Sequence, residues 1–302
     1  MQVLRTSWAK TAGPTFSDAR DEYLKKTHNR RSLNEITLAF NFAVAIIGNR
    51  PLKALKRSDG KAVLAAMLSQ DWKTATVRRR LAVLSAMVAT GLLEFEIDAR
   101  NPFASLSIPN MGKDAKDVRP FSEPELQTIA AECLLDGEAG LIAGILLETG
   151  LRVSEAAFIR IEDLNLDASV PHLHVRENAT RRIKNTPSAR KIPLLQTSLA
   201  AARMALSKAV GSPWLFPEIA SPKSNVASKR INSWLRKILG GLPHSHEFRH
   251  SVETRLRNAG VHQGVVNAIM GHAGKEKVAD MYFGGYKPEV LAEALGKIAL
   301  KL

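Results

Sequence analysis

The sequence predicts a mainly α-helical fold with a small antiparallel β region, divided into two domains. Apolar residues recur at helical spacing, and no strand pattern occurs in the first hundred residues. The alternation of apolar and polar residues that is typical of strands occurs at residues 172–177 and 190–194. The length of 302 residues suffices for two domains, because a domain usually has about 100 to 200 residues.

The N-terminal part, residues 1–110, is predicted to form a compact helical bundle. A polar residue that can cap a helix precedes or begins each predicted helix. These residues are Ser17, Ser32, the Ser58-Asp59 pair and Thr74, and the predicted helices span residues 18–27, 33–48, 60–70 and 75–94.

A linker is predicted at residues 111–118, inside a stretch that is rich in proline and charge. The second domain, residues 119–302, then begins with a helix that Ser122 caps, because Glu125 completes a capping box. A charged linker between two basic domains would let them close around a rod-like ligand.

The second domain contains most of the polar motifs. Helices at residues 126–135 and 139–148 lead to Gly150, which is predicted to end a helix in the left-handed conformation and to deliver Arg152 to a sharp turn. The two alternating segments predict an antiparallel hairpin with Lys184 at its tip. Further helices are predicted at residues 194–210 and 226–240, and the tail 287–302 carries an apolar stripe.

The charge of the chain points to a polyanionic partner. Lys and Arg number 43 against 29 Asp and Glu, which gives a net charge of +14. Such an excess favours nucleic acid over an anionic membrane surface. Candidate phosphate contacts are arginines at the start of the fourth helix and basic residues on the helix at 226–240, although a solvated helix face is the alternative in both cases. They are Arg78, Arg79, Arg80, Lys229 and Arg230.

Cysteine usage and hydropathy exclude other classes. Cys133 is the only cysteine, so neither an intramolecular disulfide nor a cysteine-based zinc site can form. No apolar run approaches the ~20 residues that span a bilayer, and the N-terminus lacks a signal peptide. We therefore expect a cytosolic protein without a membrane partner.

Residues 246–250, HEFRH, support two rival chemistries. The pattern H-E-x-x-H places His246 and His250 one helical turn apart, as in zinc peptidases that use the glutamate as a general base. Alternatively, His246 and Arg249 form a pair directed at a phosphate, with His272 and Tyr282 added from later segments.

Five motifs in order resemble the tyrosine recombinases of the phage integrase family: TGLRVSE around Arg152, the basic hairpin from Lys184 to Pro193, HEFRH, MGH around His272, and a later tyrosine. The resemblance implies that Arg152 and Arg249 clamp the scissile phosphate of double-stranded DNA, and that Lys184 protonates the leaving oxygen. It further implies that His246 and His272 bind the phosphate and assist proton movement, and that Tyr282 is the nucleophile.

The same resemblance implies a helical DNA-binding domain at residues 1–110 and a mixed α/β catalytic domain at 119–302, which form a clamp around DNA. It implies no metal and no cofactor, and assembly into a tetramer through the tail at 287–302. Tyr286 is an alternative nucleophile, since Tyr282 lies ten residues after His272. The alternative functions are a type IB-like topoisomerase, a zinc metallopeptidase and a non-catalytic DNA-binding regulator.

Overall fold

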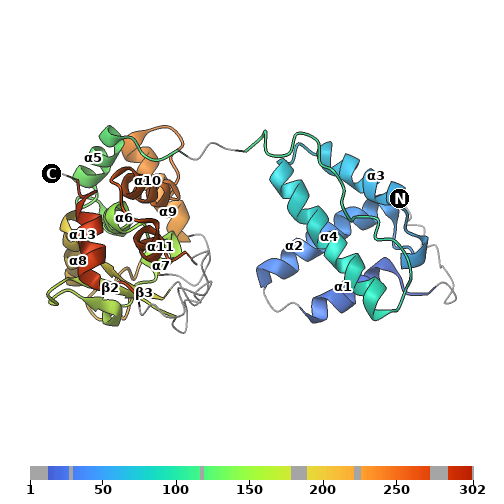
Figure 1. Cartoon of the computed structure of the whole chain (residues 1–302), viewed down its shortest axis with the longest axis horizontal. Coiled ribbons are helices and arrows are strands. Elements are labelled where there is room, and N and C mark those ends of the chain that lie inside the picture. Colours follow the sequence, from blue (N-terminus) through green and yellow to red (C-terminus); the bar gives the residue numbers. More distant parts are fainter. Residues whose placement is uncertain are drawn as a thin grey trace. The chain divides into compact units, whose positions relative to one another are not determined.

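The computed structural model describes residues 13–26, 30–115, 119–177, 189–220, 226–272 and 285–300. The chain divides into two compact units, Met1–Asp117 and Val118–Leu302 (Figure 1). This division falls inside the segment 111–118. The mainly helical fold with a small antiparallel sheet agrees with the sequence prediction.

The first unit is a helical bundle. Its elements are α1 (Phe16–Lys25), α2 (Arg30–Ile47), a 3₁₀ turn at Leu52–Ala54, α3 (Arg57–Leu68) and α4 (Thr74–Glu94). Phe16 lies at the centre of the core, with its ring centroid 5.0 Å from that of Phe40 and 6.0 Å from that of Phe103. Helices α1 and α4 cross so closely that a Cβ atom at Gly91 would collide with Ala19.

Three predicted helix starts were wrong by one to three residues. Thr15, not Ser17, caps α1, because its side chain accepts from the backbone N–H of Asp18 while the Asp18 carboxylate accepts from the backbone N–H of Thr15. Helix α2 begins at Arg30, ahead of Ser32. Helix α3 begins at Arg57, and only α4 begins at the predicted Thr74. Several polar residues near the start of a helix can each act as its N-cap, so the sequence pattern does not fix the first helical residue.

The second unit surrounds one buried helix. Helix α6 (Gly137–Thr149) is buried from Gly140 onward and contacts α5, α7, α8, α9 and α10 (Figure 1). As predicted, Ser122 is the N-cap residue of α5 and pairs with Glu125, whose carboxylate accepts from the backbone N–H and from the hydroxyl of Ser122, both at 2.8 Å. The other helices are α5 (Glu123–Glu132), α7 (Val153–Ala157), α8 (Gln196–Lys208), α9 (Val226–Leu239), α10 (Glu247–Asn258), α11 (Gln263–Met270) and α13 (Pro288–Gly296), with a 3₁₀ turn at Ile161–Asp163.

The sheet packs one face against this helical core. Strands β1 (Leu164–Asn165), β2 (His172–Val175) and β3 (Arg190–Pro193) are antiparallel and adjacent in that order. Leu173 pairs with Ile192, and both side chains are buried. The predicted hairpin is therefore confirmed, while its tip, residues 178–188, lies outside the described residues.

The apolar stripe of the tail packs within its own unit. Leu291, Leu295 and Ile298 are buried in a cluster with residues of α10 and α11, among them Leu256 and Ile269. In the described part of the chain, no helix is long and apolar enough to cross a membrane.

Candidate active site

Arg152 stands at the junction between α6 and α7. Gly150 ends α6 with φ +61°, as predicted, and Arg152 is the N-cap residue of α7. The Glu155 carboxylate accepts hydrogen bonds from the backbone N–H of Arg152 (2.9 Å) and from its Nη1 (2.7 Å). The side chain of Arg152 is 30% exposed. One edge of its guanidinium is therefore oriented by the protein, and the side chain remains accessible to a ligand.

Arg249 is the buried member of the site. It lies in α10 and is 7% exposed. Its Nη1 donates to the carbonyl oxygen of Gly150 (2.8 Å), and its Nη2 donates to the carbonyl oxygen of Met270 and to Nε2 of His272 (2.9 Å). One guanidinium thus joins α10 to the end of α6, two residues before Arg152, and to the end of α11.

This contact determines the protonation of His272. A guanidinium has donors only, so Nε2 of His272 must accept, and the imidazole is neutral with its proton on Nδ1. Burial, and then the charge of Arg249, lower the pKa of His272. While Nε2 accepts from Arg249, the ring has no free lone pair to take up a proton, but its Nδ1–H can donate a hydrogen bond to a ligand.

His246 begins the same helix as Arg249. It is the N-cap residue of α10, and its ring meets that of His250 edge-on with 5.4 Å between centroids. Burial, then His250, and more weakly Arg249 and Arg152, lower the pKa of His246. The structure therefore brings together Arg152, Arg249, His246 and His272, which the sequence had placed in three separate motifs.

Two residues of this centre were missed at the level of sequence, Glu155 and Arg190. Arg190 is the first residue of β3, and its Nη2 lies 3.0 Å from Oε2 of Glu155. Burial alone would raise the pKa of Glu155, but Arg190 and then Arg152 outweigh it and lower that pKa to about 2. The signal that could have revealed Glu155 is its position three residues after the N-cap residue Arg152.

The centre is strongly cationic. Three guanidinium groups, those of Arg152, Arg190 and Arg249, lie around the carboxylate of Glu155, and among the described residues Glu253 acts on Arg249 more weakly. Burial, followed by the charges of Arg152 and Arg190, lowers the pKa of Arg249 to about 10. The excess positive charge favours an anion that can accept several hydrogen bonds, such as a phosphodiester.

Lys184 and Tyr282 lie outside the described residues, so their predicted roles stay predictions. Tyr286 is described: it is half-buried and packs with the cluster of α10, α11 and α13. Its hydroxyl lies 2.5 Å from the position that a Cβ atom on Gly264, in the first turn of α11, would take.

The surroundings of His246 and His250 are electrostatically unfavourable for zinc. Among the described residues, no group of three or more His, Cys, Asp or Glu side chains is arranged to hold a metal ion. Between His246 and His250, Arg249 turns inward and contributes a buried cation next to the imidazoles, which is unfavourable for a second cation.

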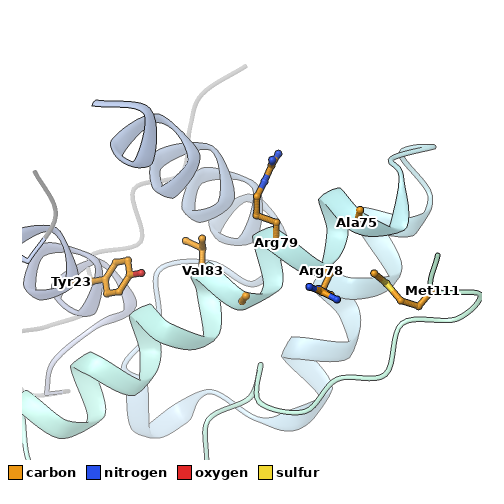
Figure 2. Close-up of a pocket in the computed structure, with 7 residues that line it drawn as sticks. Tyr23, Ala75, Arg78, Arg79, Val83 and Met111 are labelled. Carbon is orange, nitrogen blue, oxygen red and sulfur yellow. The ribbon is translucent and has the colours of Figure 1, made fainter. Parts of the chain in front are cut away.

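The predicted DNA contacts of the first unit lie on α4, around a groove of about 640 Å³. Arg78 and Arg79 line this groove with Tyr23, Val83 and Met111 (Figure 2). Arg78 lies beside Met111, and Arg79 points toward α2, where its Nε is 3.0 Å from the Glu35 carboxylate. The guanidinium of Arg80 instead lies over the ring of Trp72 at 3.8 Å from its centroid.

In the second unit, Lys229 and Arg230 are exposed on α9, whereas Trp234 of the same helix is buried. Arg230 lies 3.7 Å from the Glu218 carboxylate, a pair that is largely exposed to solvent. An exposed ion pair of this kind is weak, so Arg230, like the exposed Lys229, can turn toward a phosphate.

Known proteins are similar to this chain in sequence and in fold. The chain is 25% identical over 264 residues to the tyrosine recombinase XerC of Staphylococcus carnosus (strain TM300), covering 81% of this chain and 82% of that protein. Its fold is similar to that of the Tn1549 transposon integrase in complex with a circular intermediate DNA, with a TM-score of 0.71, 20% identity and coverage of 92% of this chain and 98% of that one.

A lambda integrase tetramer bound to a Holliday junction is also similar in fold, with a TM-score of 0.67, 18% identity and coverage of 89% of this chain and 78% of that one. The fold and the assembled motifs are those of the tyrosine recombinases. Residues 121–287, more than half of the sequence, match the model of the phage integrase family, and the chain belongs to that family.

Proposed function

We propose that this protein is a site-specific DNA recombinase that acts on double-stranded DNA in the cytosol. It cleaves and rejoins strands through a covalent 3′-phosphotyrosine intermediate. The observation that carries this proposal is the buried Arg249, which joins the end of α6, near Arg152, to His272 in one cationic centre. The match of residues 121–287 to the phage integrase family supports it.

The centre suits a phosphodiester in its transition state. As the nucleophile attacks, negative charge grows on the non-bridging phosphate oxygens, and guanidinium groups stabilise that charge by hydrogen bonds and by their own positive charge. Arg152 and Arg249 provide these groups from fixed backbone positions. Since both are held before the ligand arrives, little reorganisation is needed during the reaction.

The chemical step is a transesterification. The Tyr282 oxygen forms a bond to phosphorus while the bond from phosphorus to the 5′ oxygen breaks. The phenol proton passes to the neutral His246, and the leaving oxygen takes a proton from Lys184. His272, whose Nε2 accepts from Arg249, can donate its Nδ1–H to the phosphate. Because the phosphotyrosine bond keeps the energy of the broken phosphodiester, a 5′-hydroxyl can reverse the step without ATP. No cofactor is needed for this chemistry.

The packing of Tyr286 supports Tyr282 as the nucleophile. The hydroxyl of Tyr286 lies at Gly264, near the start of α11, whereas His272 follows the end of that helix. A helix rises about 1.5 Å per residue, so these two ends are separated by roughly 10 Å. Tyr286 therefore fits a structural role in the α11 and α13 cluster better than an attacking role at the clamp.

The first unit would add phosphate contacts that do not depend on sequence. Arg78 and Arg79 present cations at the α4 groove, and Lys229 and Arg230 present them on α9 of the second unit. Contacts of this kind position a protein on a duplex without reading its bases. Closing of the two units as a clamp around DNA is part of the same proposal.

Assembly on DNA is proposed to use the tail. Its apolar stripe, Leu291, Leu295 and Ile298, is covered by α10 and α11 of its own unit. The same surface could receive the tail of a neighbouring copy, because an identical segment makes identical contacts. Deleting residues 288–302 should then leave DNA binding intact but impair recombination, and unchanged recombination would count against this role.

The decisive experiment is capture of the covalent adduct. The protein is incubated with nicked duplex fragments, denatured, and the DNA attached to protein is sequenced, which gives the site and the strand polarity together. Tyr282→Phe should abolish the adduct and Tyr286→Phe should keep it. An intact wild-type protein without any adduct would refute the proposal, and relaxation of supercoils without strand exchange would favour the topoisomerase alternative. Stoichiometric zinc that is needed for activity would favour the metallopeptidase.

A further inference from the structure

Arg190 is a further enclosed cation of the centre, and it takes no part in the proposed reaction. Its side chain is only 6% exposed. On one side Nε donates to the carbonyl oxygen of Ile269 (2.9 Å), and on the other Nη2 pairs with Oε2 of Glu155 (3.0 Å). Two edges of the guanidinium are therefore occupied by protein groups, and Arg190 is poorly placed to bind a phosphate itself.

These partners connect Arg190 to both halves of the phosphate clamp. Glu155 also holds Arg152, through Nη1 and through the backbone N–H. Ile269 precedes Met270, whose carbonyl oxygen accepts from Arg249. The side chain of Arg190 thus contacts both supports of the clamp. One is the Glu155 carboxylate, which orients Arg152, and the other is the end of α11, which binds Arg249.

The backbone at Gly271 leaves room for this arrangement. A Cβ atom at that position would lie 2.7 Å from Nη1 of Arg190, and φ there is +62°. The guanidinium therefore packs directly on the Gly271 backbone, immediately before His272. Glycine is required at this point by its conformation and by the close approach of Arg190.

From these contacts we infer that Arg190 is a positioning residue for the phosphate clamp, which sets Arg152 through Glu155 and the end of α11 through Ile269. The inference rests on the proposed function. Lysine cannot replace it, because an ammonium is a single point charge and lacks the flat fork that reaches two partners in different directions. An Arg190→Lys substitution keeps the positive charge but removes the planar guanidinium, so the Glu155 carboxylate and the end of α11 are free to shift.

The test compares two substrates that differ only in charge. Duplexes carrying the captured site are made with an ordinary scissile phosphate or with a methylphosphonate, in which a methyl group replaces one non-bridging oxygen and removes the negative charge. Arg190→Lys and Arg190→Gln are assayed by single-turnover adduct formation. Arg176→Lys is the matched control, because Arg176 follows β2 and also pairs with a buried carboxylate, its Nε lying 2.6 Å from Asp163.

On the phosphate, Arg190→Lys should be slower than wild type by about 10- to 100-fold, the penalty for a clamp displaced by roughly 1 Å. On the methylphosphonate the loss should shrink to less than about threefold, because there is little charge left for the clamp to stabilise. DNA binding and the Arg176→Lys rates should stay close to wild type. The ratio between substrates does not depend on how much of a variant is folded, so it remains readable even if Arg190→Gln is unstable.

Equal losses on both substrates would show a merely structural role and would overturn the inference. An Arg190→Lys variant that cleaves the ordinary phosphate substrate as fast as wild type would also overturn the inference, but it would leave the proposed function unaffected. A wild-type protein that forms no adduct on either substrate would instead overturn the proposed function, and this inference with it.

Discussion

Replacing Arg249 with lysine tests whether one buried guanidinium holds the site together. In the structure, its two terminal nitrogens reach the carbonyl oxygens of Gly150 and Met270 and the Nε2 atom of His272. An ammonium group at that depth can satisfy one of these acceptors at good geometry. The other two lose their donor inside a region where water is scarce.

The magnitude follows from those lost contacts. A buried acceptor without a partner costs about 1–3 kcal/mol, and two of them give a loss of roughly 2–4 kcal/mol once partial relaxation is allowed. In a domain of about 150–250 residues, each kcal/mol lowers Tm by about 2–4 °C. Arg249→Lys should therefore lower the melting temperature of the second unit by roughly 4–16 °C.

Calorimetry of the full chain measures this loss, and adduct formation measures the reaction. Because His272 also loses the donor that keeps it neutral and oriented, the rate of cleavage should fall by about 10²- to 10³-fold. Arg257→Lys is the control: this arginine lies on the same helix but is exposed, paired only with Glu253 at 2.7 Å in the described structure. An Arg249→Lys variant with the melting temperature and rate of this control would refute the reasoning.

Three further outcomes are expected. Gly271→Ala should destabilise the second unit by at least about 1–2 kcal/mol, the cost of a left-handed residue with a side chain, and should slow cleavage because Arg190 is displaced; unchanged melting and rate would contradict this. The cleavage rate and the free energy of unfolding should both fall only as pH drops below about 6.5. The reason is that burial lowers the pKa of His246 and His272, so the imidazoles of the unfolded chain bind protons first. A rate or stability that already falls above this pH would contradict the prediction. His250→Gln should change the rate by less than about threefold, and a complete loss with release of bound zinc would favour the metallopeptidase.

Local signals in the sequence predicted much of the fold. Gly150 and the Ser122–Glu125 pair were found because their causes, a left-handed helix end and hydrogen bonds from the cap residue to a carboxylate three positions later, act within a few residues. The start of α1 was misplaced because Thr15 and Ser17 are equally able to cap a helix, and pairing of Thr15 with Pro51 across the bundle decides between them. Long-range pairing of this kind has no local signature.

Only those site residues that belong to sequence motifs were predicted. Arg152, His246, Arg249 and His272 stand in recognisable patterns, whereas nothing in the sequence distinguishes Arg190 from the other basic residues near the hairpin. Its role depends on Glu155, 35 positions earlier, and on Ile269, 79 positions later. A buried cation on a strand becomes informative only once the structure shows which carboxylate and which carbonyl surround it.

The ambiguity of HEFRH shows why spacing alone does not decide a chemistry. On a helix, positions 246, 249 and 250 all lie within one turn, so the same residues can present two imidazoles or an imidazole with a guanidinium. The fold decides by burying Arg249, with 7% exposure, between the ends of α6 and α11. A cation held there raises the electrostatic cost of binding a metal ion at the neighbouring imidazoles and lowers the cost of binding an anion. The motif therefore belongs to a phosphate site because of what α6 and α11 place around it.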